Sequence, residues 1–246
     1  MRVIKPTIIT IQPDKLWQVI LRFPPVIGMA TNCWLLKGDD GLTLIDCGCA
    51  SHAEEIISTS RHFGEIKRIV ITHGHPDHAG AAASLSRKLQ VPVLAHEDEI
   101  GFLKGTKTVS AENGSLICRC IMWIADTTGF VIPKVDNCVP LQDQQEIAGL
   151  KILHTPGHTP GSISLFDSST RALFCGDNLH TMFPKPVMGH EWFTLDKRAR
   201  NLCLQKYTLL DVTRLLAGHG KPYESKLLQS ELTDIMKRSE KRDAEL

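Results

Sequence analysis

Runs of apolar residues along the chain predict an α/β fold. In the first half, β-branched and apolar runs typical of strands alternate with stretches typical of helices. The predicted strands span residues 3–11, 31–37, 41–48, 66–73 and 91–96, and the predicted helices span residues 51–64 and 77–90. Such alternation is typical of helices layered on sheets.

The second half resumes this pattern after an interruption. Strands are predicted near 146–154, 162–167 and 171–175, then a helix over 195–210, a short strand that ends at the A-G-H-G motif, and a terminal helix from about 224. Between the halves, residues 105–140 mix glycines and prolines with Met122, Trp123 and Phe130. A connection of this length is more often a functional cover than an empty linker. We therefore expect one domain over residues 1–246, with a lid or cover insertion at 105–140 whose apolar side chains bind substrate or pack on one another.

Composition and charge narrow the classes of function. The 246 residues include 28 basic and 27 acidic ones, for a net charge of +1, so bulk charge attracts neither nucleic acid nor an anionic membrane strongly. No apolar run approaches the length of about 18 residues that a membrane-spanning helix needs. The N-terminus lacks the apolar core of a signal peptide, and the eight cysteines lack the spacing of a secreted disulfide scaffold. The expectation is a cytoplasmic protein.

The histidines are the residues that point to metal binding. The stretch T-H-G-H-P-D-H at residues 72–78 places His73 and His75 two apart at the end of a predicted strand, where alternate side chains share a face. Asp77 and His78 follow at a predicted helix start. Four potential metal ligands at one strand-to-helix bend are able to face one cavity, and imidazole and carboxylate suit zinc.

Three later motifs add ligand types at the ends of strands. His158 lies in the Pro/Gly loop H-T-P-G-H-T-P-G-S, Asp177 ends F-C-G-D, and His219 lies in A-G-H-G. Ligand sites of α/β sheets gather at strand ends. Each of these motifs alone is weak evidence for a metal site, whereas together they are strong evidence for one.

The motif H-G-H-P-D-H, followed in order by His158, Asp177 and His219, resembles the metallo-β-lactamase superfamily of metal-dependent hydrolases, in its lactonase and glyoxalase II-like branch. L-I-D-C-G at 44–48 matches an early motif of that family, and the likeness spans about residues 30 to 220. The resemblance implies a four-layer αββα sandwich with a dinuclear zinc site. By position, one ion would be held by His73, His75 and His158, the other by Asp77, His78 and His219, with Asp177 bridging.

The resemblance also implies a mechanism. Two ions that share a water lower its pKa and provide a hydroxide that attacks the substrate. Asp77 would also orient the nucleophile or pass a proton to the leaving group. Asp46 either holds a ligating imidazole in the right tautomer or caps a turn.

At some positions the chain differs from the residue patterns of known subfamilies, and these differences narrow the choice of substrate. Class B β-lactamases generally lack an aspartate at the position of Asp177, and flavodiiron reductases carry glutamate where His75 stands. Many N-acyl-homoserine lactonases have tyrosine where this chain has His180. That histidine is read either as a catalytic donor to the developing oxyanion or leaving group, or as a loop residue at the rim of the cavity.

We therefore expect a dinuclear zinc hydrolase that cleaves an ester, lactone or thioester of a small molecule, with two Zn²⁺ per chain and iron or manganese as alternative metals. One alternative is a phosphodiesterase or ribonuclease of the same superfamily, which the balanced charge disfavours. Another is a mononuclear-iron oxidoreductase similar to persulfide dioxygenases. The expected partner is the small-molecule substrate, a homodimer is left open, and nothing signals nucleic acid or membrane.

Overall fold

The computed structural model describes residues 5–22, 30–107 and 131–244. The described residues up to Leu141 form one compact unit, and those from Gln142 form a second. Among the described residues, the longest and most apolar helices still fall short of what crossing a membrane requires. The prediction of a single domain over residues 1–246 stays a prediction.

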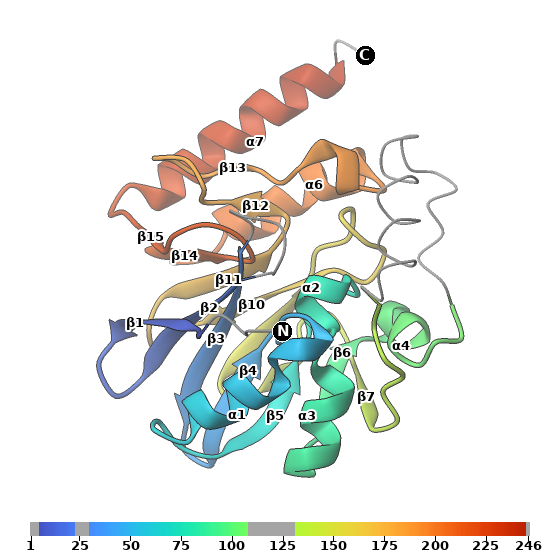
Figure 1. Cartoon of the computed structure of the whole chain (residues 1–246). Coiled ribbons are helices and arrows are strands. Elements are labelled where there is room, and N and C mark those ends of the chain that lie inside the picture. The colour runs from blue at the N-terminus through green and yellow to red at the C-terminus, as the bar shows by residue number, and fades with distance from the viewer. Residues whose placement is uncertain (1–4, 23–29, 108–130, 245–246) are drawn as a thin grey trace. The chain divides into compact units, whose positions relative to one another are not determined.

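In the first unit, the described strands form one sheet in the order β1-β2-β3-β4-β5-β6-β7 (Figure 1). These strands are β1 (Thr7–Gln12), β2 (Leu16–Arg22), β3 (Ala30–Gly38), β4 (Gly41–Ile45), β5 (Ile66–Val70), β6 (Val93–His96) and β7 (Cys138–Leu141). The strands β1 to β4 pair antiparallel, whereas β4 to β7 pair in parallel. Because parallel strands end at the same edge, the segments that follow β4 and β5 come together there.

Helices of the first unit cover the parallel part of this sheet. They are α1 (Ala53–Ser60), which follows the short 3₁₀ helix η1 (Ala50–His52), then α2 (Pro76–Ala79), α3 (Ala82–Leu89) and α4 (Glu97–Leu103). Apolar residues of α1 and α3, such as Ile56 and Leu85, are buried in one cluster with Leu44, Ile69 and Val93 of the sheet. The small residues at the start of α3 allow its close packing, because Ala82 and Ala83 are buried there.

In the second unit, the described strands form a sheet in the order β15-β14-β11-β10-β9-β8. They are β8 (Glu146–Ile147), β9 (Leu150–His154), β10 (Ile163–Asp167), β11 (Ala172–Gly176), β14 (Arg214–Ala217) and β15 (Tyr223–Glu224). The β11–β14 pair is parallel and the other pairs are antiparallel. A separate hairpin consists of β12 (Leu179–His180) and β13 (Val187–Met188). The segments after β11 and β14 therefore leave the same edge of this sheet.

Two long helices, α6 (Lys197–Thr208) and α7 (Leu228–Ala244), pack on each other in the second unit (Figure 1). A short 3₁₀ helix, η3 (Glu191–Phe193), precedes α6. Leu204, Tyr207 and Leu232 of these helices are buried in one cluster with Leu173 and Leu215 of the sheet. The core of this unit lies where α6 and α7 meet the sheet.

The structure departs from the predicted elements in several places. The helix predicted over 77–90 is two helices, α2 and α3, with Gly80 between them; a Cβ at Gly80 would lie 2.7 Å from the Cα of Cys49, so the chain passes very close there. The strand β2 and the helix α4 were not predicted. The final residues of the predicted insertion at 105–140 belong to β7 in the sheet, and residues 108–130, with Met122, Trp123 and Phe130, lie outside the described residues.

Candidate metal centre

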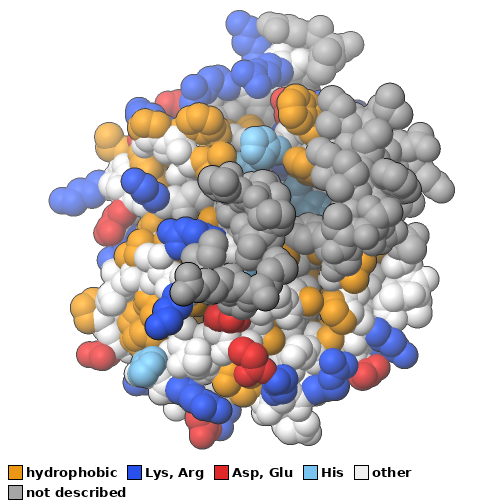
Figure 2. All heavy atoms as spheres, in the orientation of Figure 1, with side chains coloured by type: hydrophobic (Ala, Val, Ile, Leu, Met, Phe, Trp, Pro, Cys, Tyr) orange, Lys and Arg blue, Asp and Glu red, His pale blue; other side chains and the backbone are white. Residues whose placement is uncertain are grey.

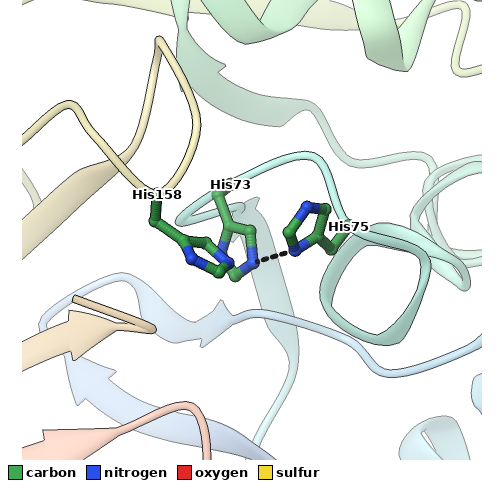
Figure 3. A group of neighbouring side chains, drawn as sticks. All are labelled: His73, His75 and His158. Atoms are coloured by element: carbon green, nitrogen blue, oxygen red, sulfur yellow. Dashed lines mark hydrogen bonds between the residues drawn. The ribbon is translucent and has the colours of Figure 1, made fainter. Parts of the chain in front are cut away.

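The first unit presents four of the predicted ligands on the segment between β5 and α2. His73 and His75 follow the strand, and Nε2 of His73 lies 3.1 Å from Nδ1 of His75 (Figure 3). Pro76 begins α2, which places Asp77 and His78 in its first turn. Oδ2 of Asp77 lies 3.7 Å from Nε2 of His78. The four side chains predicted from the H-G-H-P-D-H motif are thus brought together within this unit.

One buried carboxylate, that of Asp46, determines how two of these imidazoles are protonated. Asp46 follows β4, and its Oδ2 accepts hydrogen bonds from Nδ1 of His78 at 2.9 Å and from the hydroxyl of Thr72 at 2.8 Å. Because the Thr72 hydroxyl gives its one proton to Asp46, it accepts a hydrogen bond from Nδ1 of His73, 3.1 Å away. Both imidazoles therefore carry their proton on Nδ1, and each keeps its lone pair on Nε2.

The backbone around Asp46 supports this arrangement. Its Oδ1 accepts a hydrogen bond from the backbone N–H of Thr72 at 2.8 Å, so the carboxylate joins the end of β4 to the end of β5. Asp46 has φ of 56°, in the left-handed region that aspartate tolerates better than most residues. The structure thus favours the orienting role over that of a turn cap.

Glu99 holds the turn between His73 and His75. This residue of α4 is fully buried, and its Oε2 accepts a hydrogen bond from the backbone N–H of Gly74 at 2.7 Å. A Cβ at Gly74 would lie 2.5 Å from the same oxygen. Glycine is therefore required at this point for the carboxylate to reach the backbone.

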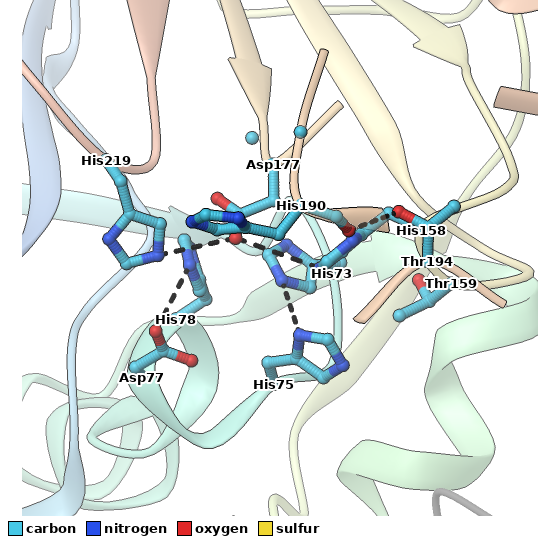
Figure 4. A network of polar contacts seen from close by, with 12 residues as sticks. His73, His75, Asp77, His78, His158, Thr159, Asp177, His190, Thr194 and His219 are labelled. Carbon is cyan, nitrogen blue, oxygen red and sulfur yellow. Dashed lines mark hydrogen bonds and ion pairs between the residues drawn. The ribbon is translucent and has the colours of Figure 1, made fainter. Parts of the chain in front are cut away.

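The second unit gathers the other three predicted ligands around Asp177. Oδ2 of Asp177, after β11, lies 3.3 Å from Nε2 of His219 and 3.8 Å from Nε2 of His158 (Figure 4). The segments that carry Asp177 and His219 are joined by a hydrogen bond from Gly218 N–H to the carbonyl of Gly176 at 2.8 Å. His158 and Asp177 are both nearly buried, with exposed fractions of 2% and 8%.

His180 and His190 lie beside this group. His180 of β12 is 3% exposed, and its Nε2 lies 3.8 Å from Oδ2 of Asp177. Among the described residues, that nitrogen has no hydrogen-bond partner. The ring of His190 meets that of His180 edge to face at a centroid distance of 4.8 Å. Partial burial, and next the neighbouring His180, lower the pKa of His190.

Close backbone packing fixes the segments that present these side chains. A Cβ at Gly157, beside His158, would lie 2.4 Å from the backbone nitrogen of Arg200 at the start of α6, and Gly157 has φ of 134°. A Cβ at Gly189 would lie 1.9 Å from the carbonyl oxygen of Asp177. Both positions need glycine, because any side chain would push away a ligand-bearing segment.

The donor sets of both units fit divalent metal ions. Ligand atoms bound to a tetrahedral zinc at about 2.1 Å lie about 3.4 Å from one another. The Nε2–Nδ1 distance of 3.1 Å between His73 and His75, and the Nε2–Oδ2 distance of 3.3 Å between His219 and Asp177, are of that size. The lone pairs on Nε2 of His73 and His78 are in the form that a metal requires, and imidazole with carboxylate is a donor set for zinc or iron.

Two histidines outside the predicted ligand set also have defined contacts. His154 lies at the end of β9, where its Nε2 donates to the carbonyl of Pro160 at 2.9 Å. The ring of His190 adjoins that of His180. The residues missed from sequence are Thr72, Glu99 and His190. Thr72 opens the stretch T-H-G-H-P-D-H but is not a metal-ligand type, and only hydrogen bonds or packing with distant residues reveal the roles of these three.

Comparison with known proteins agrees with these observations. The model of the metallo-β-lactamase superfamily matches residues 26–219. The probable metallo-hydrolase YflN of Bacillus subtilis is 30% identical over 221 residues, which cover 79% of this chain and 81% of YflN. The hydroxyacylglutathione hydrolase GloC of Haemophilus influenzae is 29% identical over 212 residues, covering 80% of this chain and 88% of GloC.

Solved structures show the same fold. The crystal structure of TTHA1623 in a di-iron-bound form matches with a TM-score of 0.62 and 26% identity, and covers 82% of this chain and 94% of that protein. The predicted α/β fold of the metallo-β-lactamase type is thereby confirmed. From the match of its sequence and the likeness of its fold, the chain belongs to the metallo-β-lactamase superfamily.

Proposed function

We propose that the chain is a dinuclear metal-dependent hydrolase that cleaves an ester, lactone or thioester of a small molecule. The observation that carries the proposal is the hydrogen-bond network of Asp46, which leaves the lone pairs of His73 and His78 on Nε2. A buried carboxylate used in this way is typical of the support around a metal site. The name of GloC, a hydrolase of an acylated thiol, favours a thioester within this range.

The proposed ligand set has seven members. His73, His75 and His158 would hold one ion, Asp77, His78 and His219 the other, and Asp177 would bridge them. When bound, such ions polarise the substrate carbonyl and lower the pKa of water to about 7. We propose zinc as the resident metal, while the di-iron form of TTHA1623 keeps iron as the alternative.

Three residues of the chain have proposed roles beside the metal ions: Asp46 orients ligands, Asp77 transfers a proton, and His180 stabilises the oxyanion. Asp46 keeps two ligating imidazoles in one tautomer and orientation. The carboxylate of Asp77, which is partly exposed in the first turn of α2, would accept a proton from the nucleophile and pass it to the leaving group. The unpaired Nε2 of His180 is available to donate a hydrogen bond to the oxyanion that develops on the substrate.

The alternative functions differ in substrate and in metal. A phosphodiesterase or ribonuclease would use the same ligands, but the net charge of +1 is small for nucleic-acid binding. Over the lower part of the face that Figure 2 shows, basic and acidic side chains are interspersed among the described residues. A persulfide dioxygenase-like oxidoreductase would hold a single iron.

A substrate panel tests the proposal. The purified full chain, loaded with zinc, is assayed with thioesters, a lactone, an aryl ester, a β-lactam and a phosphodiester. We expect turnover of at least one carboxylic ester, lactone or thioester, with kcat/KM at least about tenfold above that for the β-lactam and the phosphodiester. Turnover of the phosphodiester alone would replace the proposed function with the nuclease alternative.

Two variants test the proposed roles, with His62→Ala, an exposed histidine outside the motifs, as the control. Asp77→Ala should abolish turnover while the fold remains. His180→Ala should lower kcat by about 100-fold at unchanged metal content, which is the usual loss when one oxyanion donor is removed. Unchanged kinetics in metal-quantified His180→Ala would make His180 a structural residue.

A further inference from the structure

We propose that a basic pocket in the second unit binds an anionic group of the substrate, a carboxylate or a phosphate, at the end remote from the bond that is cleaved. This inference rests on the proposed hydrolase function and specifies its substrate class. It is carried by a cavity, by the charges that line it, and by its contact with the Asp177 group.

The pocket lies among β13, η3, α6 and α7, all within the second unit, and has a volume of about 410 Å³. That volume is within the range of small-molecule sites, roughly 300–1,000 Å³. The residues on which the argument depends are His190, Lys197, Arg200, Arg238, Ser239 and Arg242. A cavity of this size holds the charged end of a substrate rather than a macromolecule.

Positive charge dominates the lining. Lys197, Arg200, Arg238 and Arg242 line the cavity together with one carboxylate, that of Glu191. Glu191 pairs with Lys197 at 3.1 Å. This ion pair lowers the pKa of Glu191, and the charges of Arg200 and Arg242 lower it further. Among the described residues of the lining, Glu191 is thus the one carboxylate beside four cationic side chains.

These charges gather on one side of the unit. Arg238 and Arg242 are one turn apart on α7, so both side chains project from the same face of that helix. In Figure 2, basic side chains gather at the top of the view, where Figure 1 places α7. Two guanidinium groups at this spacing are suited to grip one oxyanion.

Arg200 makes the pocket wall rigid. It is 2% exposed, and its Nη1 donates to the carbonyl of Gly189 at 2.7 Å and to the hydroxyl of Thr194 at 3.0 Å. These bonds join α6 to the segment after β13. The two contacts hold the guanidinium group in place.

Ser239 lies between Arg238 and Arg242 on α7 and also lines the pocket. Its side chain is 6% exposed, and its Oγ lacks a hydrogen-bond partner among the residues that the structure describes.

The pocket adjoins the group around Asp177. His190 lines the pocket, and its ring contacts that of His180 at a centroid distance of 4.8 Å. Nε2 of His180 in turn lies 3.8 Å from Oδ2 of Asp177. A substrate whose anionic end occupies the pocket would extend past His190 toward the proposed metal ligands.

A binding experiment tests the pocket without any assay of hydrolysis. Calorimetric titrations of the full chain with inorganic phosphate and with glutarate compare two double variants of α7. Arg238→Gln with Arg242→Gln removes two lining charges, and Lys237→Gln with Lys241→Gln, the matched control, removes two charges of the same helix that do not line the pocket. We expect the first double variant to raise the Kd of the preferred anion at least about tenfold, and the control to leave it within about twofold.

Equal binding of both anions by the two double variants would overturn the proposal. The anion that binds more tightly to the unsubstituted chain distinguishes a phosphate site from a carboxylate site.

A kinetic experiment connects the pocket to the substrate. The ratio of kcat/KM for an acyl thioester of an anionic thiol to that for the same acyl thioester of a neutral thiol is measured for both double variants. We expect the arginine double variant to lower this ratio at least about tenfold and the lysine control to preserve it. A ratio unchanged in the arginine variant overturns the assignment to substrate. Absence of any hydrolysis together with arginine-dependent phosphate or glutarate binding would instead reject the proposed function and leave the anion site standing.

Discussion

A single carboxylate, that of Asp46, orients two of the proposed metal ligands. It accepts a hydrogen bond from Nδ1 of His78 directly and reaches His73 through the hydroxyl of Thr72. Removing this carboxylate would leave two imidazoles free to rotate or to change tautomer, although Asp46 itself is not one of the proposed metal ligands.

We therefore expect Asp46→Asn to lower metal affinity by about 10- to 100-fold, the usual effect of removing such a partner. Competition with a coloured chelator measures the affinity. Asp40→Asn is the control, because Asp40 forms an exposed ion pair with Arg68 in the same unit. An affinity equal to that of the control would show that the Asp46 network does not support metal binding.

For single residues, the sequence predicted the metal ligands and, among the residues that support them, offered only Asp46, as one of two interpretations. The ligand types and their order were readable because H-G-H-P-D-H is short and specific. Thr72 adjoins the motif and looks like an ordinary strand residue, and Glu99 lies 25 positions beyond the turn that it holds. Such partners depend on where distant segments meet, and no local pattern carries that information.

Among the elements, the turn around Gly157 holds His158 against the start of α6. The backbone N–H of Asp196 donates to the carbonyl of Gly157 at 2.8 Å, and the helix then begins at Lys197. A side chain at position 157 would collide with the backbone of Arg200.

Gly157→Ala should therefore destabilise the chain by about 3 kcal/mol, from both backbone strain and the clash. Gly149→Ala is the matched control, since Gly149 also has positive φ but its Cβ would meet nothing within 4 Å. That variant should cost only about 1 kcal/mol. Urea unfolding compares the two, and equal losses would mean that the close approach to α6 does not matter.

His52 ties the start of α1 to strand β2. Its Nδ1 accepts from the backbone N–H of Cys49 at 3.0 Å, so its Nε2 carries the proton that is donated to the carbonyl of Arg22, 3.2 Å away. Burial lowers the pKa of His52, which means that the folded chain keeps this imidazole neutral.

The unfolded chain, with a histidine pKa of about 6.5, takes up a proton that folded His52 resists. The stabilisation is thus complete above about pH 6.5 and is lost as the pH falls below it, by at most about 1.4 kcal/mol per pH unit. His52→Gln should show a shallower fall in the free energy of unfolding between pH 7.5 and 5.5. Parallel curves for the two proteins would contradict this assignment.

The sequence predicted most strands and helices because their apolar runs are long and bounded by glycine or proline. The predicted elements did not include β2, although L-W-Q-V-I-L-R is apolar enough for a strand. Nor did they include α4, where three acidic residues and Gly101 conceal a short helix. The division of 77–90 into α2 and α3 depends on the contact of Gly80 with Cys49, which is again a long-range effect.

At the scale of the whole molecule, each unit brings part of the proposed ligand set together. His73, His75, Asp77 and His78 belong to the first unit, and His158, Asp177 and His219 to the second. Each set lies on segments that follow the ends of strands. In this way a chain of balanced charge and ordinary composition brings its histidines together. Because the proposed ions draw ligands from both units, metal content reports on the whole chain.

The most direct test of the central claim is the metal content of the purified full-length protein, measured by inductively coupled plasma mass spectrometry. The account predicts about two metal ions per chain, mainly zinc, as a dinuclear site requires. It also predicts that His219→Ala, which changes only the second unit, lowers the content to about one ion or fewer. About one iron and negligible zinc per chain, or no metal at all, would contradict the account.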